Sequence, residues 1–329
     1  MYDLHVSTNL VCDDDNILQL RESYPNGLTF VVGDVHGEYE TLKRLLEKIR
    51  FDSKKDHVFF VGDYNAGGNP RALLEMLSKH FQANHEAPGF HMIRGNHERE
   101  LSPQFYLENL PDVMIIKRKE LCYFICHAGM IRDVYDLIND DILQNPEITV
   151  KAYRLDDSTI AYDAPYRQVI WSRRGLYSQK SRWQLWPSEG KLIENRSCII
   201  HGHTPYSFFF KEGGLGYGDR NLFWEKQHVW FSEDLQSFDV DSDIKGRNAF
   251  GETYRGLSCL CLEALEEIVE ANNGYLTIDG IKEGQNVVFS APYCLNQDSV
   301  SGGNIDLILN ASLQMSTISF GEGGKGIVI

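Results

Sequence analysis

Short apolar runs alternate with amphipathic stretches along the first 130 residues of the chain. Consecutive apolar residues are typical of buried strands, whereas apolar residues at every third or fourth position predict helices. Helices are predicted at 39–51 and at 70–83, where Pro70 suits a first helical turn. Strands are predicted at 28–34 (LTFVVGD), 57–63 (HVFFVGD), 90–96 (FHMIRGN) and 121–129 (LCYFICHAG). This alternation predicts an α/β fold with a largely parallel sheet at its centre.

The second half of the chain is less regular. It predicts a buried strand at 198–204 (CIIHGHT) and a helix at 261–273 (CLEALEEIVEANN). Residues 206–273 depart in composition, with glycines and aromatic residues followed by the acidic run DVDSD. The closing segments 286–294 and 304–320 predict strands that form an antiparallel second sheet.

Composition and charge narrow the class of protein. The chain has 329 residues with 42% hydrophobic side chains, enough for a sizeable core, and a net charge of -15. That charge argues against a general nucleic-acid or anionic-membrane surface, and a bound phosphate would need local positive charge from a metal or arginine. The seven cysteines form no CxxC pair, and neither a secretory signal nor a membrane-spanning run is visible. We therefore expect a soluble, cytoplasmic protein from a reducing compartment.

Polar side chains with metal-binding chemistry follow five of the predicted strands. In an open α/β sheet, the carboxyl ends of the strands line the ligand crevice, so these side chains should meet at one rim. Two carboxylates, one amide and imidazoles, without sulfur, suit Mn²⁺, Fe or Zn. A single aspartate between two ions can bridge them for displacement at phosphorus. The residues at the strand ends are Asp34, His36, Asp63, Asn96, His97, His127 and His203.

Five short motifs containing these residues, in this order, resemble the signature of the calcineurin-like metallophosphoesterases, and specifically of the PPP phosphoprotein phosphatases. FSAPYC (289–294) is similar to the FSAPNYC segment of the eukaryotic-type branch, with one asparagine missing. The resemblance implies one catalytic domain over 1–329 with a four-layer α/β/β/α fold, a central β-sandwich and an active site at strand carboxyl ends. Residues 206–273 exceed what that core needs, so we expect an insertion there. The motifs are GDVHG, GDY, RGNHE, CHAG and GHT.

The resemblance also implies a role for each residue. One metal would be held by Asp34, His36 and Asp63, and the other by Asp63, Asn96, His127 and His203, with His201 as the alternative to His203. The ions would be divalent, Mn²⁺ first and Fe or Zn as alternatives. A metal-bound hydroxide would attack phosphorus directly, and His97 would protonate the leaving oxygen as general acid.

The phosphate pocket departs from that family. Where relatives read GDYVDRG this chain reads GDYNAGG, so Ala66 and Gly67 replace the aspartate that orients the acid and the arginine that contacts phosphate. Loss of these partners should weaken acid catalysis and phosphate binding. The candidates that contact phosphate instead are Arg173 and Arg174 in WSRR, Arg94 in RGNHE, and Tyr293 in FSAPYC.

The leading prediction is a metal-dependent phosphatase acting on a phosphoprotein or phosphopeptide, at phospho-Ser/Thr or phospho-Tyr. Two alternatives stay open: a hydrolase of small phosphoesters or dinucleotide polyphosphates, and a pseudophosphatase that binds partners without turnover. A eukaryotic-type tail beside the bacterial-like WSRR segment suggests a bacterial effector acting inside a host cell. The sequence indicates no oligomeric state.

Overall fold

The fold was obtained as a computed structural model. It describes residues 14–65, 67–101, 110–119, 121–145, 147, 149–155, 169–171, 197–204, 222–224, 229–231, 237–242, 244, 256–272, 287–292, 315–320 and 326–328. The helices are α1 (Asp14–Ser23), α2 (Tyr39–Lys48), α3 (Pro70–His80), α4 (Asn96–Leu101), α5 (Arg132–Gln144) and α9 (Leu262–Ala271). Among these helices, none has the length and apolar character needed to cross a bilayer.

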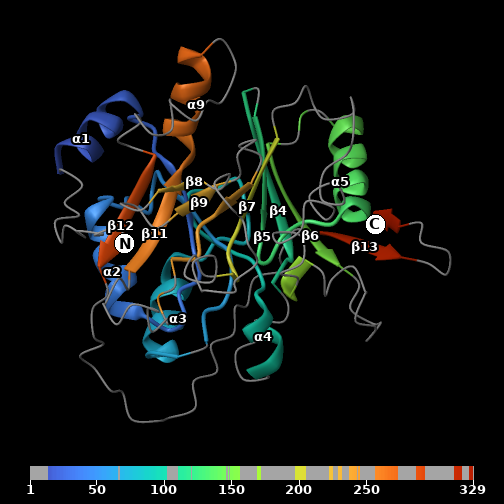
Figure 1. The fold of residues 1–329 in the computed structure, drawn as a ribbon, viewed down its shortest axis with the longest axis horizontal. Coiled ribbons are helices and arrows are strands. Elements are labelled where there is room, and N and C mark those ends of the chain that lie inside the picture. The colour runs from blue at the N-terminus through green and yellow to red at the C-terminus, as the bar shows by residue number, and fades with distance from the viewer. Residues whose placement is uncertain are drawn as a thin grey trace, which may run out of the picture.

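The strands form two sheets that lie next to each other at the centre of the molecule (Figure 1). The first sheet has the order β12-β11-β1-β2-β3 and the second the order β14-β13-β6-β4-β5-β7-β10-β9-β8. The strands of the first sheet are β1 (Thr29–Val32), β2 (His57–Phe60), β3 (Gly89–Met92), β11 (Gly256–Cys261) and β12 (Val288–Pro292). Those of the second are β4 (Val113–Arg118), β5 (Leu121–Cys126), β6 (Val150–Leu155), β7 (Ser197–His201), β8 (Leu222–Trp224), β9 (Val229–Phe231), β10 (Ser237–Asp239), β13 (Ser316–Phe320) and β14 (Gly326–Val328).

The parallel part of the first sheet is built as the hydrophobic pattern predicts. Strands β1, β2 and β3 are parallel neighbours, and α2 and α3 form the crossovers between them. Helix α3 starts where the Asn69 side chain accepts a hydrogen bond from the Ala72 N–H (3.1 Å), with Pro70 in its first turn. Strands β11 and β12 extend this sheet in the antiparallel sense.

The prediction that the two closing segments form an antiparallel sheet of their own is wrong. Strand β12 pairs with β11 in the first sheet, whereas β13 pairs in parallel with β6 in the second. Their apolar alternation predicts strands but contains no information about the neighbouring strand, which long-range contacts decide. The sequence analysis also predicted no strand at β4 or β6, although β4 begins with the apolar run VMII (113–116).

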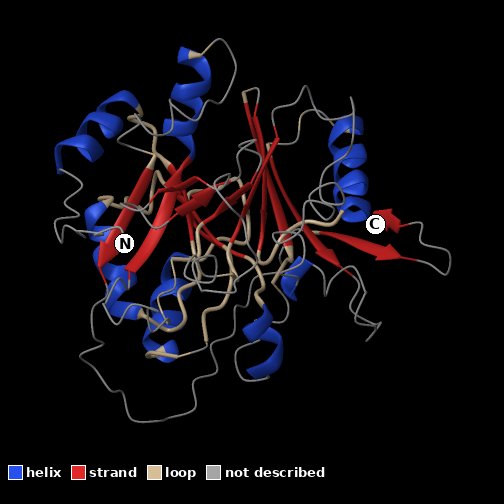
Figure 2. Ribbon diagram, in the orientation of Figure 1, coloured by secondary structure: helices blue, strands red, loops and turns tan. Residues whose placement is uncertain are grey.

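The side chains of β4 and β5 alternate between two hydrophobic cores, as the period of a strand requires. Met114 and Ile125 belong to the larger core, which also contains residues of the first sheet, α2 and α3. Val113 and Phe124 point the other way, into a smaller core that α5 closes. Figure 2 shows the strands at the centre and the helices on either side, which confirms the predicted layers of helix, sheet, sheet and helix.

Part of the segment 206–273 belongs to the two sheets. Strand β10 lies parallel to β7, and β11 lies between β1 and β12. Helix α9 follows β11 directly, and its buried residues Leu265 and Val269 belong to the larger core. The predicted insertion at 206–273 stays a prediction.

Candidate metal centre

The predicted metal ligands meet between the two sheets, at the carboxyl ends of their parallel strands. Asp34 and His36 follow β1, Asp63 follows β2, and Asn96 starts α4 after β3. His127 and His203 come from the other sheet, where they follow β5 and β7. All six residues are buried.

The backbone is strained at this place. Among the described residues, five other than glycine have a positive φ, and three of them are predicted ligands: His36 (50°), Asp63 (57°) and His203 (69°). Such conformations cost free energy and persist where the surrounding structure holds them, most often at functional sites. Three of these strained residues are predicted ligands, which indicates that the positions of their side chains are maintained at the cost of an unfavourable backbone conformation.

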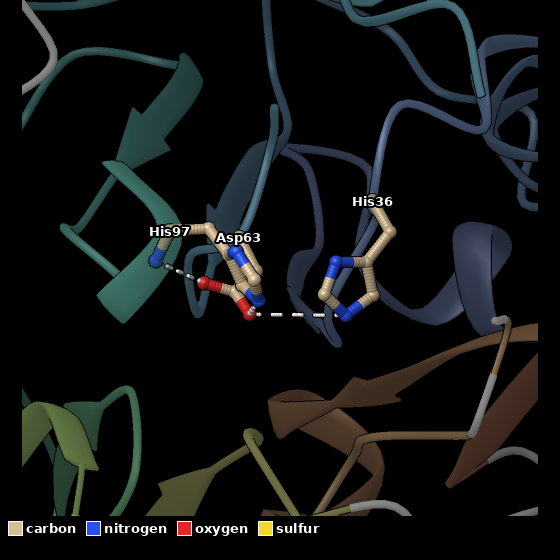
Figure 3. Close-up of side chains that lie close together, drawn as sticks. All are labelled: His36, Asp63 and His97. Atoms are coloured by element: carbon tan, nitrogen blue, oxygen red, sulfur yellow. Dashed lines mark hydrogen bonds and ion pairs between the residues drawn. The ribbon is translucent and has the colours of Figure 1, made fainter. Parts of the chain in front are cut away.

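The Asp63 carboxylate lies between two groups of side chains. Its Oδ2 faces the first group, 3.7 Å from His36 Nε2 and 3.8 Å from His97 Nε2 (Figure 3). Its Oδ1 faces the second group, 3.4 Å from His127 Nε2. Two sets of ligand atoms close enough to hold a cation result: His36, Asp63 and His97, and Asp63, His127 and His203. Asp63 is the member that they share.

The ligand atoms of the second group are suited to binding a cation. His127 Nδ1 lies 2.8 Å from the Val61 carbonyl oxygen, which can only accept, so Nδ1 carries the proton and Nε2 presents a lone pair. That lone pair lies 2.8 Å from Asn96 Oδ1, which in turn lies 2.9 Å from His203 Nδ1. Lone pairs of a ring nitrogen and an amide oxygen repel each other at this distance unless a proton or a cation lies between them. Within this group, Asp63, His127 and His203 offer ligand atoms close enough together to hold a metal ion.

Asp34 adds negative charge to both groups. Its Oδ2 accepts a hydrogen bond from the His203 N–H (3.0 Å) and lies 3.8 Å from His36 Nε2, while its Oδ1 lies 4.0 Å from His127 Nδ1. Burial, followed by the carboxylates of Asp241, Asp63 and Asp239, raises its pKa well above the usual value. A bound cation would stabilise the charged form and reverse this effect.

Glycine is required where the backbone passes the two central carboxylates. A Cβ atom at Gly95 would collide with Asp63 Oδ1, and one at Gly202 would collide with Asp34 Oδ1. Both glycines belong to the sequence motifs RGNHE and GHT. Their role is close approach to the ligand oxygens.

Glu98 is a residue of this site to which the sequence reasoning assigned no role. It is buried, and its carboxyl oxygens accept three backbone hydrogen bonds: Oε2 from Asp63 N (2.7 Å) and Gly95 N (2.8 Å), and Oε1 from Tyr64 N (2.7 Å). Burial, together with the Asp63 carboxylate, raises its pKa to about 7. Glu98 thus connects the strained turn at Asp63 to the turn after β3 through backbone hydrogen bonds to both. Its position in RGNHE was the only signal that could have revealed it.

The structure favours His203 over His201 as a ligand. His201 is buried, its Nδ1 lies 3.1 Å from the Gly202 carbonyl oxygen and 4.0 Å from Asp239 Oδ1, and burial lowers its pKa to about 4. It belongs to neither of the two groups found in the described residues. His97, by contrast, is half-buried, and its N–H donates to Asp63 Oδ1 (3.1 Å).

Of the predicted phosphate-binding residues, the structure describes Arg94. Arg94 is fully buried, and its Nε donates to Asp112 Oδ1 (2.7 Å). Asp112 Oδ2 also accepts from Leu155 N (2.8 Å), so this ion pair ties β3 to the second sheet and favours a structural role for Arg94. Residue Ala66 and the candidates Arg173, Arg174 and Tyr293 lie outside the described residues.

Comparisons with known proteins identify a matching family and two relatives. The calcineurin-like phosphoesterase family model matches residues 28–242, which contain all the predicted ligands. The symmetrical bis(5'-nucleosyl)-tetraphosphatase of Actinobacillus succinogenes is 34% identical over 248 residues, covering 66% of this chain and 82% of that protein. The protein of the same name from Mannheimia succiniciproducens is 38% identical over 207 residues, covering 57% of this chain and 70% of that protein.

Among solved structures, a protein serine/threonine phosphatase from Saccharomyces cerevisiae with similarity to human phosphatase PP5 matches with a TM-score of 0.42 and 16% identity. The match covers 87% of this chain and 88% of that one, but a likeness of this degree carries no argument about function. The family model spans well over half of the chain. The chain therefore belongs to the calcineurin-like phosphoesterase family.

Proposed function

We propose that this phosphoesterase binds two divalent cations with Asp63 between them and hydrolyses a dinucleoside polyphosphate. The observation that carries the two-cation site is the division of the Asp63 carboxylate, one oxygen toward His36 and His97 and the other toward His127. When bound, two cations would polarise phosphoryl oxygens and lower the pKa of a water molecule. The donor set suits Mn²⁺, Fe or Zn.

The residues of the chain have separate tasks in this proposal. His36 and Asp34 would hold the first cation, and Asn96, His127 and His203 would hold the second. His97 is held by its backbone bond to Asp63, while its ring, 30% exposed, is open to a substrate. In this proposal, His97 would give a proton to the leaving oxygen.

The nucleotide substrate is supported by the relatives. Both tetraphosphatases are more than 30% identical to this chain, and one aligns over 82% of its length. A second candidate, a phosphoprotein, is supported by FSAPYC at 289–294, which resembles a segment of protein phosphatases. The hypothesis of a pseudophosphatase is the third outcome to test.

A substrate panel with metal analysis tests these proposals. The protein loaded with Mn²⁺ should bind two ions per chain and hydrolyse diadenosine tetraphosphate faster than phosphoserine or phosphotyrosine peptides. Faster turnover of a phosphopeptide would replace the nucleotide proposal with the phosphatase one. Two bound ions without turnover of any substrate would indicate a pseudophosphatase, and fewer than two ions would refute the bridging role of Asp63.

A further inference from the structure

Trp171 is an exposed aromatic side chain beside the metal centre. Among the described residues, the large hydrophobic side chains with substantial exposure are Leu143 (55%) and Trp171 (36%). Leu143 lies on α5, whereas Trp171 lies next to a predicted ligand. An indole that keeps a third of its surface in water loses part of the free energy that burial would supply. Its place next to the ligands suggests a task other than filling the core.

The backbone on which Trp171 stands is firmly held. The two preceding residues, Val169 and Ile170, are fully buried in the smaller core between β5 and α5. The Val169 carbonyl accepts a hydrogen bond from Ala128 N (2.8 Å), and Ala128 directly follows the ligand His127. The indole therefore follows buried backbone that is hydrogen-bonded to the residue after the candidate ligand His127.

The indole borders the second ligand group without contributing a ligand atom. Its ring centroid lies 6.2 Å from that of His203, with an angle of 80° between the planes, so the two rings meet edge to face. The His203 ring also meets that of His127 edge to face, at 4.9 Å between the ring centroids. A phosphate held by cations at this group would thus place the adjoining part of the substrate near the exposed indole.

We propose that Trp171 determines substrate specificity by stacking against an aromatic base that lies next to the bound phosphate. This inference rests on the proposed nucleotide substrate. Stacking of a base on an aromatic side chain depends on flat apolar surface and requires no charged partner, which suits a chain with a net charge of -15. The arrangement separates recognition of the base from the metal chemistry at Asp63.

Binding of AMP compared with ribose 5-phosphate tests the proposal, because the two compounds share the phosphate and differ by the base. Titration calorimetry on the Mn²⁺-loaded protein should show tighter binding of AMP, by about tenfold. Trp171→Ala should remove that preference and leave the affinity for ribose 5-phosphate within about twofold. Trp171→Phe should keep most of the preference. Leu143→Ala, the matched loss of an exposed apolar side chain, should behave as the wild type.

Each result has a defined meaning. Equal affinity of the wild type for the two compounds overturns the proposal, and so does a preference for AMP that survives in Trp171→Ala. An equal loss of affinity for both compounds in Trp171→Ala also overturns it, because the indole would then only support His203. If the preference depends on Trp171 but diadenosine tetraphosphate is not hydrolysed, the stacking site stands and the proposed function fails.

Discussion

The carboxylate of Glu98 offers the sharpest test of how the candidate metal centre is held in place. The substitution Glu98→Gln keeps the shape of the side chain but replaces one oxygen with an NH₂ group. If the amide oxygen takes the position of Oε2, it keeps the bonds from Asp63 N and Gly95 N. The NH₂ group then faces Tyr64 N–H, which at present donates over 2.7 Å. Two donors would oppose each other in a buried place.

The cost of this change follows from leaving a buried donor without an acceptor, about 1–3 kcal/mol in the free energy of unfolding. The opposite orientation of the amide would leave two donors unsatisfied and cost more. The substitution should also weaken Mn²⁺ binding by about 10- to 100-fold, because the backbone at Asp63 is strained and depends on Glu98. Both effects concern the turn that positions Asp63.

The assay is urea denaturation at pH 8, above the pKa of about 7 for Glu98, so that the wild-type carboxyl is charged. Titration calorimetry with Mn²⁺ gives the second readout. Glu75→Gln is the matched control, since it removes the same charge from a half-exposed i,i+4 pair with Arg71 and should cost less than about 0.5 kcal/mol. If Glu98→Gln loses no more stability than Glu75→Gln and binds Mn²⁺ as the wild type does, the anchoring role of Glu98 is refuted.

Three further predictions follow from the same structure. Asp63→Asn should lower the metal content below two ions per chain and reduce hydrolysis by more than about 100-fold, whereas the exposed control Asp133→Asn should change neither; metal analysis and initial rates check this. Arg94→Met should lower the free energy of unfolding by about 3–5 kcal/mol, because Asp112 would lose its buried partner. A higher substrate KM at unchanged metal content would instead support a phosphate-binding role for Arg94. Burial, followed by His57 and His85, lowers the pKa of His91 well below 6.5, so the unfolded chain takes up a proton that the folded chain does not, and stability should fall as the pH drops below about 6.5. Between pH 7 and pH 5, the free energy of unfolding should depend less on pH in His91→Gln than in the wild type. An equal pH dependence in the two proteins would contradict this role of His91.

Much of the site could be predicted from the sequence because its residues follow strands with a strong local signal. The apolar runs that become β1, β2, β3, β5 and β7 are continuous and end in glycine-containing motifs. Parallel strands bring their carboxyl ends to one edge, so the candidate ligands that follow them were expected to lie close together. The type of residue at each strand end then indicated a cation.

Tertiary structure decided what depends on contacts between distant segments. These contacts include the pairing of β12 and β13 with their neighbouring strands, the ion pair of Arg94 with Asp112 and the hydrogen bond of Glu98 to Asp63. Each joins residues far apart in the sequence, so no local sequence pattern predicts it. The same holds for the indole of Trp171 at His203, which only the fold brings together. Periodicity along a sequence determines which residues form a strand and which face they occupy. The choice of partner follows from the shape and charge of surfaces that exist only after the chain has folded.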